Sequence, residues 1–113
     1  MTPLTEAEIA ASLSALASGW AHKETVVPAP KRYENSLFRE YDFKDFLEAV
    51  AFMNESAPAI EKLKHHPIWE NKYNRINVTL TTWDAGNRVT QLDVKLAILL
   101  DGFAEKHGEK TFR

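Results

Sequence analysis

Two adjacent histidines followed by a proline, His65-His66-Pro67, are the residues of this sequence best suited to proton transfer. The chain has four histidines, and the other two, His22 and His107, lie far from this pair in sequence. Imidazole accepts or donates a proton near pH 7, so two of them at one site can act as acid and base. The structural alternative is that both bind the last free carbonyls of a helix and complement the negative end of its dipole. Spacing alone leaves both interpretations open.

Glu61 precedes His65 by four residues, so the two share one face if the segment is helical. A carboxylate in that place can hold an imidazole in one tautomer and raise its basicity. The alternative is a solvated glutamate paired with a lysine, and the spacing does not choose between them.

Three aromatic residues follow the histidines, and most residues of this kind belong to cores: Trp69, Tyr73 and Trp83. Trp83 differs because it falls on the polar face of a predicted strand, with Asn77, Thr79 and Thr81. An indole at that place can bind a flat heterocycle or form a subunit interface.

Metal and cofactor chemistry lack support in the sequence. Adjacent histidines do not share a helix face, the chain has no cysteine, and it has no zinc-binding His-Glu-x-x-His motif. A Gly-rich phosphate loop and a Gly-x-Ser-x-Gly elbow are absent as well. We therefore expect no metal and no cofactor, and neither serine-based hydrolysis nor nucleotide-dependent chemistry.

Length and composition are those of a small globular protein. The 113 residues allow one domain, 1–113, with a core over about 4–104. Hydrophobic residues make up 44% and charged residues 27%, with a net charge of −2 and signs that alternate along the chain, which disfavours direct binding to nucleic acid. The start of the sequence has no signal-peptide pattern, and no apolar run reaches the roughly 20 residues of a membrane span. We expect a cytoplasmic protein without membrane contact.

The first half of the sequence predicts one helix, two strands and the start of a second helix. Thr5 and Glu8 have capping-box spacing, with Gly19 as a stop for the first helix. Residues 36–43 alternate as a strand, which pairs with the chain after Trp20 across an unusually long connection over about 25–35. A second helix opens at Asp42 or at Lys44-Asp45. Its predicted apolar stripe comprises Phe46, Val50, Met53, Ala57 and Ile60.

The second half predicts the end of that helix, two more strands and a last helix. Pro58 should kink or restart the second helix, which ends near His65 or His66 because Pro67 disfavours helical geometry before it. Strands are expected over 69–73 and 74–83, and Thr90 can cap the last helix. Its predicted buried side comprises Leu92, Leu96, Leu99, Leu100 and Phe103, and the charged tail from residue 105 is expected to fray.

The segment from Glu61 to Asp93 resembles the signature of the pterin-4a-carbinolamine dehydratases. The matching residues are Glu61, His65-His66-Pro67, Tyr73, Trp83 and Asp93, all at the spacing of the family. The flanks agree with it too: Gly19-Trp20, the strand ending at Phe43, Lys44-Asp45-Phe46, Tyr73-Asn74 and the run from Asp93 to Ala97. The likeness covers most of the chain, and the combination of motifs is highly specific.

The resemblance implies a two-layer α+β fold in the order α-β-β-α-β-β-α, a four-stranded antiparallel sheet with three helices packed on one face. It implies dehydration of 4a-hydroxytetrahydrobiopterin, or a related 4a-hydroxytetrahydropterin, to quinonoid dihydropterin, which recycles pterin for aromatic amino acid hydroxylation. His65, His66 and Glu61 would be catalytic. The resemblance assigns substrate binding to Trp20, Pro67, Tyr73, Trp83 and Asp93.

Trp83 stands where the family often has a third histidine, and indole cannot shuttle a proton at neutral pH. The family forms dimers and tetramers, so we expect a homodimer or homotetramer, with an aromatic amino acid hydroxylase as a further partner. Two alternatives remain. One is a non-catalytic dimerisation cofactor of a homeodomain transcription factor, and the other is a pterin-binding protein of another pathway, such as molybdenum cofactor metabolism.

Overall fold

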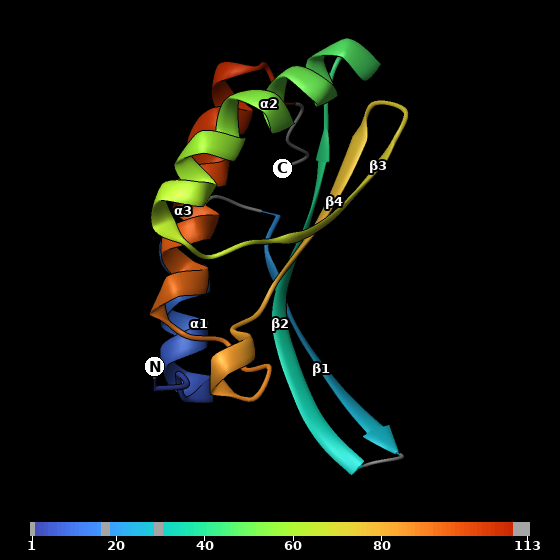
Figure 1. Ribbon diagram of the computed structural model, residues 1–113. Helices are drawn as coiled ribbons and strands as arrows, with labels where there is room; N and C mark the ends of the chain where they lie inside the picture. The colour runs from blue at the N-terminus through green and yellow to red at the C-terminus, as the bar shows by residue number, and fades with distance from the viewer. Residues whose placement is uncertain (1, 17–18, 29–30, 110–113) are drawn as a thin grey trace.

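The computed structural model describes residues 2–16, 19–28 and 31–109, and the helices and strands in them form two layers (Figure 1). The three helices lie on one face of a four-stranded antiparallel sheet, so the predicted α+β fold is confirmed. The elements in chain order are α1 (Glu6–Ala15), β1 (Ala21–Pro28), β2 (Lys31–Asp42), α2 (Phe46–Leu63), β3 (Ile68–Lys72), β4 (Arg75–Leu80), a 3₁₀ turn (Trp83–Ala85) and α3 (Gln91–Lys106). No helix among the described residues has the length and apolar character to cross a membrane.

The strand order is β1-β2-β4-β3, which places β2 and β4 in the centre of the sheet. Leu37 pairs with Leu80 and Tyr41 with Ile76, and all four side chains are fully buried under the helices. Successive side chains along a strand point to opposite faces of the sheet. The other face of β2 and β4 therefore carries the intervening residues, such as Phe38 and Thr79, which form a neighbouring pair.

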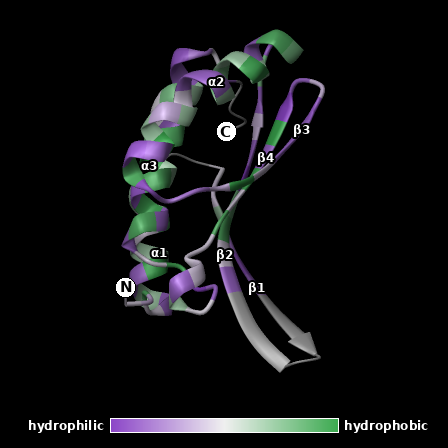
Figure 2. Ribbon diagram, viewed as in Figure 1, coloured by the Kyte–Doolittle hydropathy of each residue, from purple (hydrophilic) through white to green (hydrophobic). Residues whose placement is uncertain are grey.

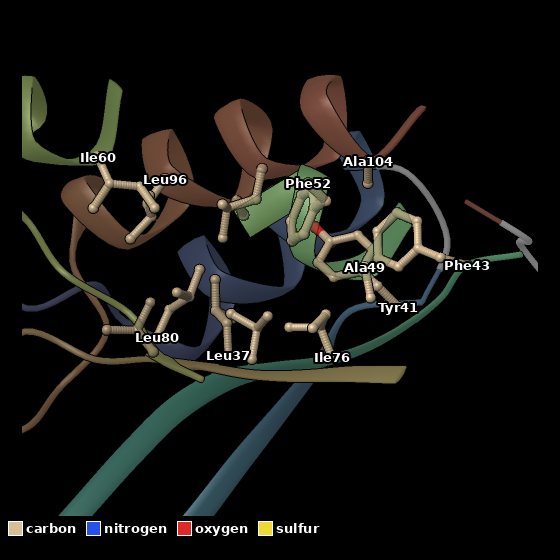
Figure 3. Packing of buried hydrophobic residues seen from close by; sticks show 14 of the residues in the cluster. Leu37, Tyr41, Phe43, Ala49, Phe52, Ile60, Ile76, Leu80, Leu96 and Ala104 are labelled. Atoms are coloured by element: carbon tan, nitrogen blue, oxygen red, sulfur yellow. The ribbon is translucent and has the colours of Figure 1, made fainter. Parts of the chain in front are cut away.

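An aromatic cluster fills the core at the end of the sheet where β2 leads into α2 (Figure 3). The rings of Phe43 and Phe52 lie 5.0 Å apart, and those of Tyr41 and Phe52 lie 5.2 Å apart. Trp69 of β3 meets Phe52 edge-on at 6.3 Å. These contacts attach α2 to both halves of the sheet, and α2 is the helix that leads to the two histidines.

The predicted long connection over 25–35 is wrong. β1 continues to Pro28 and β2 already begins at Lys31, and these two residues pair at the end of the ladder. The prolines of this stretch suggested irregular structure, but β1 is an edge strand. A proline at the end of an edge strand removes no necessary hydrogen bond. Residues 29–30, including Pro30, lie outside the described residues.

The predicted apolar stripe of α2 is confirmed at Ile60, and Met53 packs against the core, but the stripe is wrong at Phe46 and Ala57, which are exposed. The residues that are buried are Ala49, Phe52, Ser56 and Ile60, whereas Phe46 is 47% exposed. Both patterns have helical spacing, and the small residues Ala49 and Ser56 contribute little to a hydrophobicity pattern although they allow close packing. Helix α2 runs through Pro58, so the predicted restart does not occur.

Both predicted helix caps are confirmed. Thr5 caps α1 and Thr90 caps α3, each in a capping box with the third residue of its helix, Glu8 and Asp93. Leu96 and Leu100 are buried on α3 as predicted, while Leu92, Leu99 and Phe103 are only partly buried, and the fully covered positions include Ala97 and Ala104.

The predicted fraying of the tail is wrong as far as Glu109. Helix α3 continues to Lys106, and both ring nitrogens of His107 lie within hydrogen-bonding distance of carboxylates of α2, at 3.0 Å from Glu48 and 3.2 Å from Glu55. Glu109 folds back against Arg39 of β2, with 2.7 Å between Nη2 and Oε1. Residues 110–113 lie outside the described residues.

Arg39 lies at the centre of a buried charged network beneath the helices. Its Nη1 donates to Asp101 of α3 at 2.8 Å, and Asp101 also accepts the indole N–H of Trp20 and the hydroxyl of Tyr41. Burial, together with the negative charge of Asp101, raises the pKa of Tyr41 far above its usual value, so Tyr41 remains a neutral donor. Burial likewise raises the pKa of Asp101, although its donors oppose the shift. The network joins the residue before β1, the last part of β2 and the second half of α3.

We expect Arg39→Met to destabilise the fold strongly. The change leaves Asp101 and the 5%-exposed side chain of Glu109 without their shared cation, which costs about 3–5 kcal/mol for a buried pair that loses one partner. Trp20→Phe is the matched control, because it removes one hydrogen-bond donor and keeps an aromatic ring, at a cost of about 1 kcal/mol. Urea denaturation of the two variants measures both values. Equal losses would show that the charges of this network contribute little.

Candidate active site

The end of α2 points the two adjacent histidines in different directions. Lys64 caps the helix in the left-handed region, at φ 56° and ψ 37°, and its N–H still bonds back to Ile60 and Glu61. A residue with a Cβ in this conformation costs about 1–2 kcal/mol. The turn it makes sends His65 into the interior, where only 8% of the residue is exposed, and leaves the side chain of His66 63% exposed.

The imidazole of His65 meets a fully buried carboxylate. Its Nε2 lies 2.6 Å from Oδ1 of Asp93, which is the third residue of α3 and has no solvent exposure. The other oxygen, Oδ2, accepts the hydroxyl of Thr82 at 2.8 Å and the backbone N–H of Thr90 at 2.9 Å. Both contacts come from donors, and the carboxylate also lies at the positive end of the α3 dipole.

An ionised Asp93 fixes the tautomer of His65. A carboxylate only accepts, so Nε2 of His65 must carry the proton that it donates to Oδ1. The neutral ring then has its lone pair on Nδ1, for which no described residue supplies a hydrogen bond. Nδ1 is therefore the nitrogen of His65 that is available to a ligand as a base.

His66 is paired with a carboxylate of a different kind. Its Nε2 lies 2.8 Å from Oε1 of Glu61, and both side chains are largely exposed, at 63% and 77%. The pairing differs from the one expected from helical spacing, in which Glu61 would meet His65. The left-handed turn at Lys64 rotates His65 away and brings His66 round to Glu61 instead.

Both histidines line one open cleft of about 510 Å³. The end of α2, the segment after β4 and the start of α3 form its walls, which consist of Lys64, His65, His66, Thr81, Thr82, Trp83, Asp84 and Leu92. Trp83 is 81% exposed. The predicted strand over 74–83 ends earlier than expected, at Leu80, and Trp83 begins a 3₁₀ turn, so its indole belongs to a loop at the cleft and not to the sheet face.

The structure brings together five of the eight residues proposed from the sequence. His65, His66 and Trp83 line the cleft, Glu61 binds His66, and Asp93 lies behind His65. Pro67 is partly buried between His66 and β3 and does not line the cleft.

Two predicted substrate-binding aromatics lie elsewhere in the single chain. The indole N–H of Trp20 lies 3.0 Å from each carboxylate oxygen of Asp101, within the network around Arg39. Tyr73, 67% exposed, occupies the turn between β3 and β4, at the opposite end of β3 from the histidines. Neither residue lines the cleft of its own chain.

Sequence analysis missed Thr82 and assigned Thr90 only a capping role. Thr90 and Asp93 have the spacing of a capping box, and that signal was present in the sequence. Nothing in the sequence indicated that the carboxylate of this box would also meet an imidazole 28 residues earlier in the chain. Within the described ranges, no three histidine or acidic side chains are grouped as metal ligands would be.

The fold and the cleft together define a class: a small two-layer α+β protein with paired histidines, each held by a carboxylate, at an open ligand-sized cleft. Comparison with known proteins identifies that class. The family model described as pterin 4 alpha carbinolamine dehydratase matches residues 2–103, and the chain belongs to this family.

Relatives and a solved structure agree with the family. A protein of Rhizobium leguminosarum bv. trifolii (strain WSM2304), provisionally named pterin-4-alpha-carbinolamine dehydratase, is 41% identical over 108 residues, which cover 96% of this chain and 97% of that one. A protein of Brucella ovis with the same provisional name is 41% identical and covers 89% of this chain and 94% of its own length. The crystal structure of a transcriptional coactivator/pterin dehydratase from Brucella melitensis has a TM-score of 0.78 and 40% identity, covering 91% of this chain and 99% of that one.

Proposed function

We propose that this chain, acting as a single domain, dehydrates a 4a-hydroxytetrahydropterin, such as 4a-hydroxytetrahydrobiopterin, to the quinonoid dihydropterin. The observation that carries the proposal is the pair His65–Asp93, a buried imidazole with a fixed tautomer, next to a second histidine at the same cleft. The family supports a pterin as the ligand. Such a substrate arises when an aromatic amino acid hydroxylase uses a tetrahydropterin, so the reaction would recycle that pterin.

The reaction requires two proton movements and no change of oxidation state. The proton of the ring nitrogen N5 departs, its electron pair forms the C4a=N5 double bond, and the C4a–O bond breaks. The leaving hydroxyl takes up a proton and departs as water. One base near N5 and one acid near the hydroxyl therefore suffice.

His65 is the better candidate for the base. Its Nδ1 has the free lone pair, and the buried Asp93 carboxylate stabilises the imidazolium that forms when Nδ1 takes the proton. An aspartate that orients a catalytic imidazole and stabilises its charged form acts in the same way in serine proteases.

His66 is the better candidate for the acid. It stands in solvent with its Nε2 2.8 Å from Oε1 of Glu61, and water can return the proton it gives away. Trp83, at the position of the family's frequent third histidine, offers an exposed indole against which a flat pterin ring can pack.

A second role, as a binding partner for another protein, has one observation in its favour. The first turn of α2 exposes two large apolar side chains, Phe46 at 47% and Leu47 at 76%, which form an apolar surface. This turn lies at the upper end of the helix layer, where the ribbon is coloured hydrophobic (Figure 2). We propose that this surface mediates self-association into a dimer or tetramer.

The solved relative from Brucella melitensis is described as a transcriptional coactivator as well as a pterin dehydratase. A coactivator partner would require a surface of this kind.

We expect His65→Gln and His66→Gln each to lower the turnover of chemically generated 4a-hydroxytetrahydropterin by about 100-fold, the usual effect of losing an acid or base. The pH profiles separate the roles. Loss of the base His65 should remove the fall in rate at low pH, whereas loss of the acid His66 should remove the fall at high pH. Stopped-flow absorbance measures both. Turnover near that of the parent protein in both variants would refute the catalytic assignment. If His65→Gln removes the fall in rate at high pH and His66→Gln the fall at low pH, His65 is the acid and His66 the base.

We expect Trp83→Ala to weaken pterin binding about 3- to 10-fold, because a stacked aromatic contact contributes about 0.5–1.5 kcal/mol. Trp83→His should leave turnover unchanged or raise it. Tyr73→Ala removes a ring that is also exposed but lies at the other end of the β3–β4 hairpin, so it should leave binding unchanged. Calorimetry with a stable dihydropterin measures the affinities. Unchanged affinity in Trp83→Ala would place the indole outside the pterin site.

We expect light scattering at micromolar concentration to show a dimer or tetramer, and Leu47→Lys to shift it toward the monomer. Ile68→Lys is the control, because Ile68 is also exposed, at 65%, but belongs to β3. A strictly monomeric parent protein would refute self-association. If Ile68→Lys dissociates the oligomer and Leu47→Lys does not, the interface lies on the sheet and not on α2.

A further inference from the structure

The hydrogen bonds around Asp93 form a chain with one direction. The hydroxyl oxygen of Thr90 accepts two backbone N–H groups of α3, that of Leu92 at 3.2 Å and that of Asp93 in the capping box. Thr82 donates its hydroxyl to Oδ2 of Asp93, and the hydroxyl oxygens of Thr82 and Thr90 lie 2.7 Å apart. A hydroxyl has a single hydrogen. Since Thr82 gives its hydrogen to Asp93, Thr90 must be the donor between the two threonines.

The resulting order is Thr90 to Thr82 to Asp93, with His65 donating to the same carboxylate from the other side. Thr82 and Thr90 are 3% and 0% exposed, so water does not compete for these positions. The side chain of Thr82 sets the direction of the chain, because it lies between the hydroxyl of Thr90 and the carboxylate of Asp93. Its place after β4 also links the end of the sheet to the start of α3.

We propose that Thr82 and Thr90 are positioning residues for His65. Together they hold the Asp93 carboxylate in the one rotation that presents Oδ1 to Nε2 of His65. The inference rests on the proposed function for its effect on turnover, but the orientation of the imidazole is a property of the protein alone.

A carboxylate can rotate about its last bond, and two donors on Oδ2 prevent that rotation. The backbone N–H of Thr90 is one of them and belongs to the helix cap, so no side-chain substitution removes it directly. The hydroxyl of Thr82 is the other, and it binds the side chains of the capping box but no backbone group of α3. Replacing Thr82 therefore removes a donor to Asp93 while the backbone hydrogen bonds of the helix terminus keep their partners.

Other charged groups lie on the cleft side of His65 and do not contact Asp93. Lys64, His66 and Asp84 line the cleft, and Glu61 binds His66. Among the described residues, the partners of the Asp93 side chain are His65, Thr82 and Thr90. The charge state of the cleft can thus change without breaking the chain of hydrogen bonds behind it.

The test compares Thr82→Val, which keeps the shape of the side chain and removes its hydroxyl, with Thr82→Ser, which keeps the hydroxyl. Thr79→Val is the control, because Thr79 is a threonine of β4 on the opposite face of the sheet. Two properties are measured: the exchange rate of the His65 Nε2 proton by nitrogen-15 NMR, and kcat and KM for the 4a-hydroxytetrahydropterin.

We expect Thr82→Val to speed exchange of the Nε2 proton and to lower kcat, each by about tenfold, with KM nearly unchanged. One hydrogen bond to a charged group accounts for an effect of this size. Thr82→Ser should restore both properties, and Thr79→Val should change neither. If Thr82→Val does not fold, Thr82→Ala replaces it in the same comparison.

Exchange and kcat equal to those of the parent protein in Thr82→Val would overturn the proposal. An equal loss in Thr82→Ser would also overturn it, because the methyl group and not the hydroxyl would then matter. A parent protein without dehydratase turnover would refute the proposed function instead, and the exchange rates would still decide the positioning of His65.

Discussion

A carboxylate without solvent exposure needs donors for both of its oxygens, and Asp93 obtains them from three parts of the chain. His65 comes from the end of α2, Thr82 from the segment after β4, and Thr90 from the cap of α3. The cleft is formed where these same three segments meet. Burial of this one charge therefore fixes the relative positions of the segments that would bind and convert a ligand.

The left-handed conformation of Lys64 is the second constraint on the site. Adjacent side chains on a regular helix point about 100° apart and both stay at its surface. By ending the helix one residue before the pair, Lys64 lets His65 turn inward to Asp93 while His66 stays in solvent beside Glu61. Two residues of the same type thus obtain opposite surroundings, which is the condition for opposite roles in proton transfer.

Local signals in the sequence predicted local structure well. The caps at Thr5 and Thr90 and the alternation of the central strands are short-range patterns, and the structure confirms them. The predictions failed where a contact between residues far apart in the sequence determines the local structure. Pro28 suggested a loop because the sequence does not show that β1 is an edge strand. The environment of Trp20 depends on Asp101, 81 residues later, and the burial of Asp93 depends on three segments that no spacing relates.

The two capping boxes of the protein differ in what surrounds the same motif. In α1, the Glu8 carboxylate accepts the N–H of Thr5 at the protein surface, and water can replace either group. In α3, the equivalent carboxylate is also the partner of His65 and Thr82. Position 8 can therefore accept many residues at the cost of a little helix stability, as exposed caps generally do. Position 93 has almost no freedom to vary, although glutamate, asparagine and serine also cap helices. Asparagine and serine have no carboxylate, and the longer side chain of glutamate places its carboxylate at a different distance from the backbone.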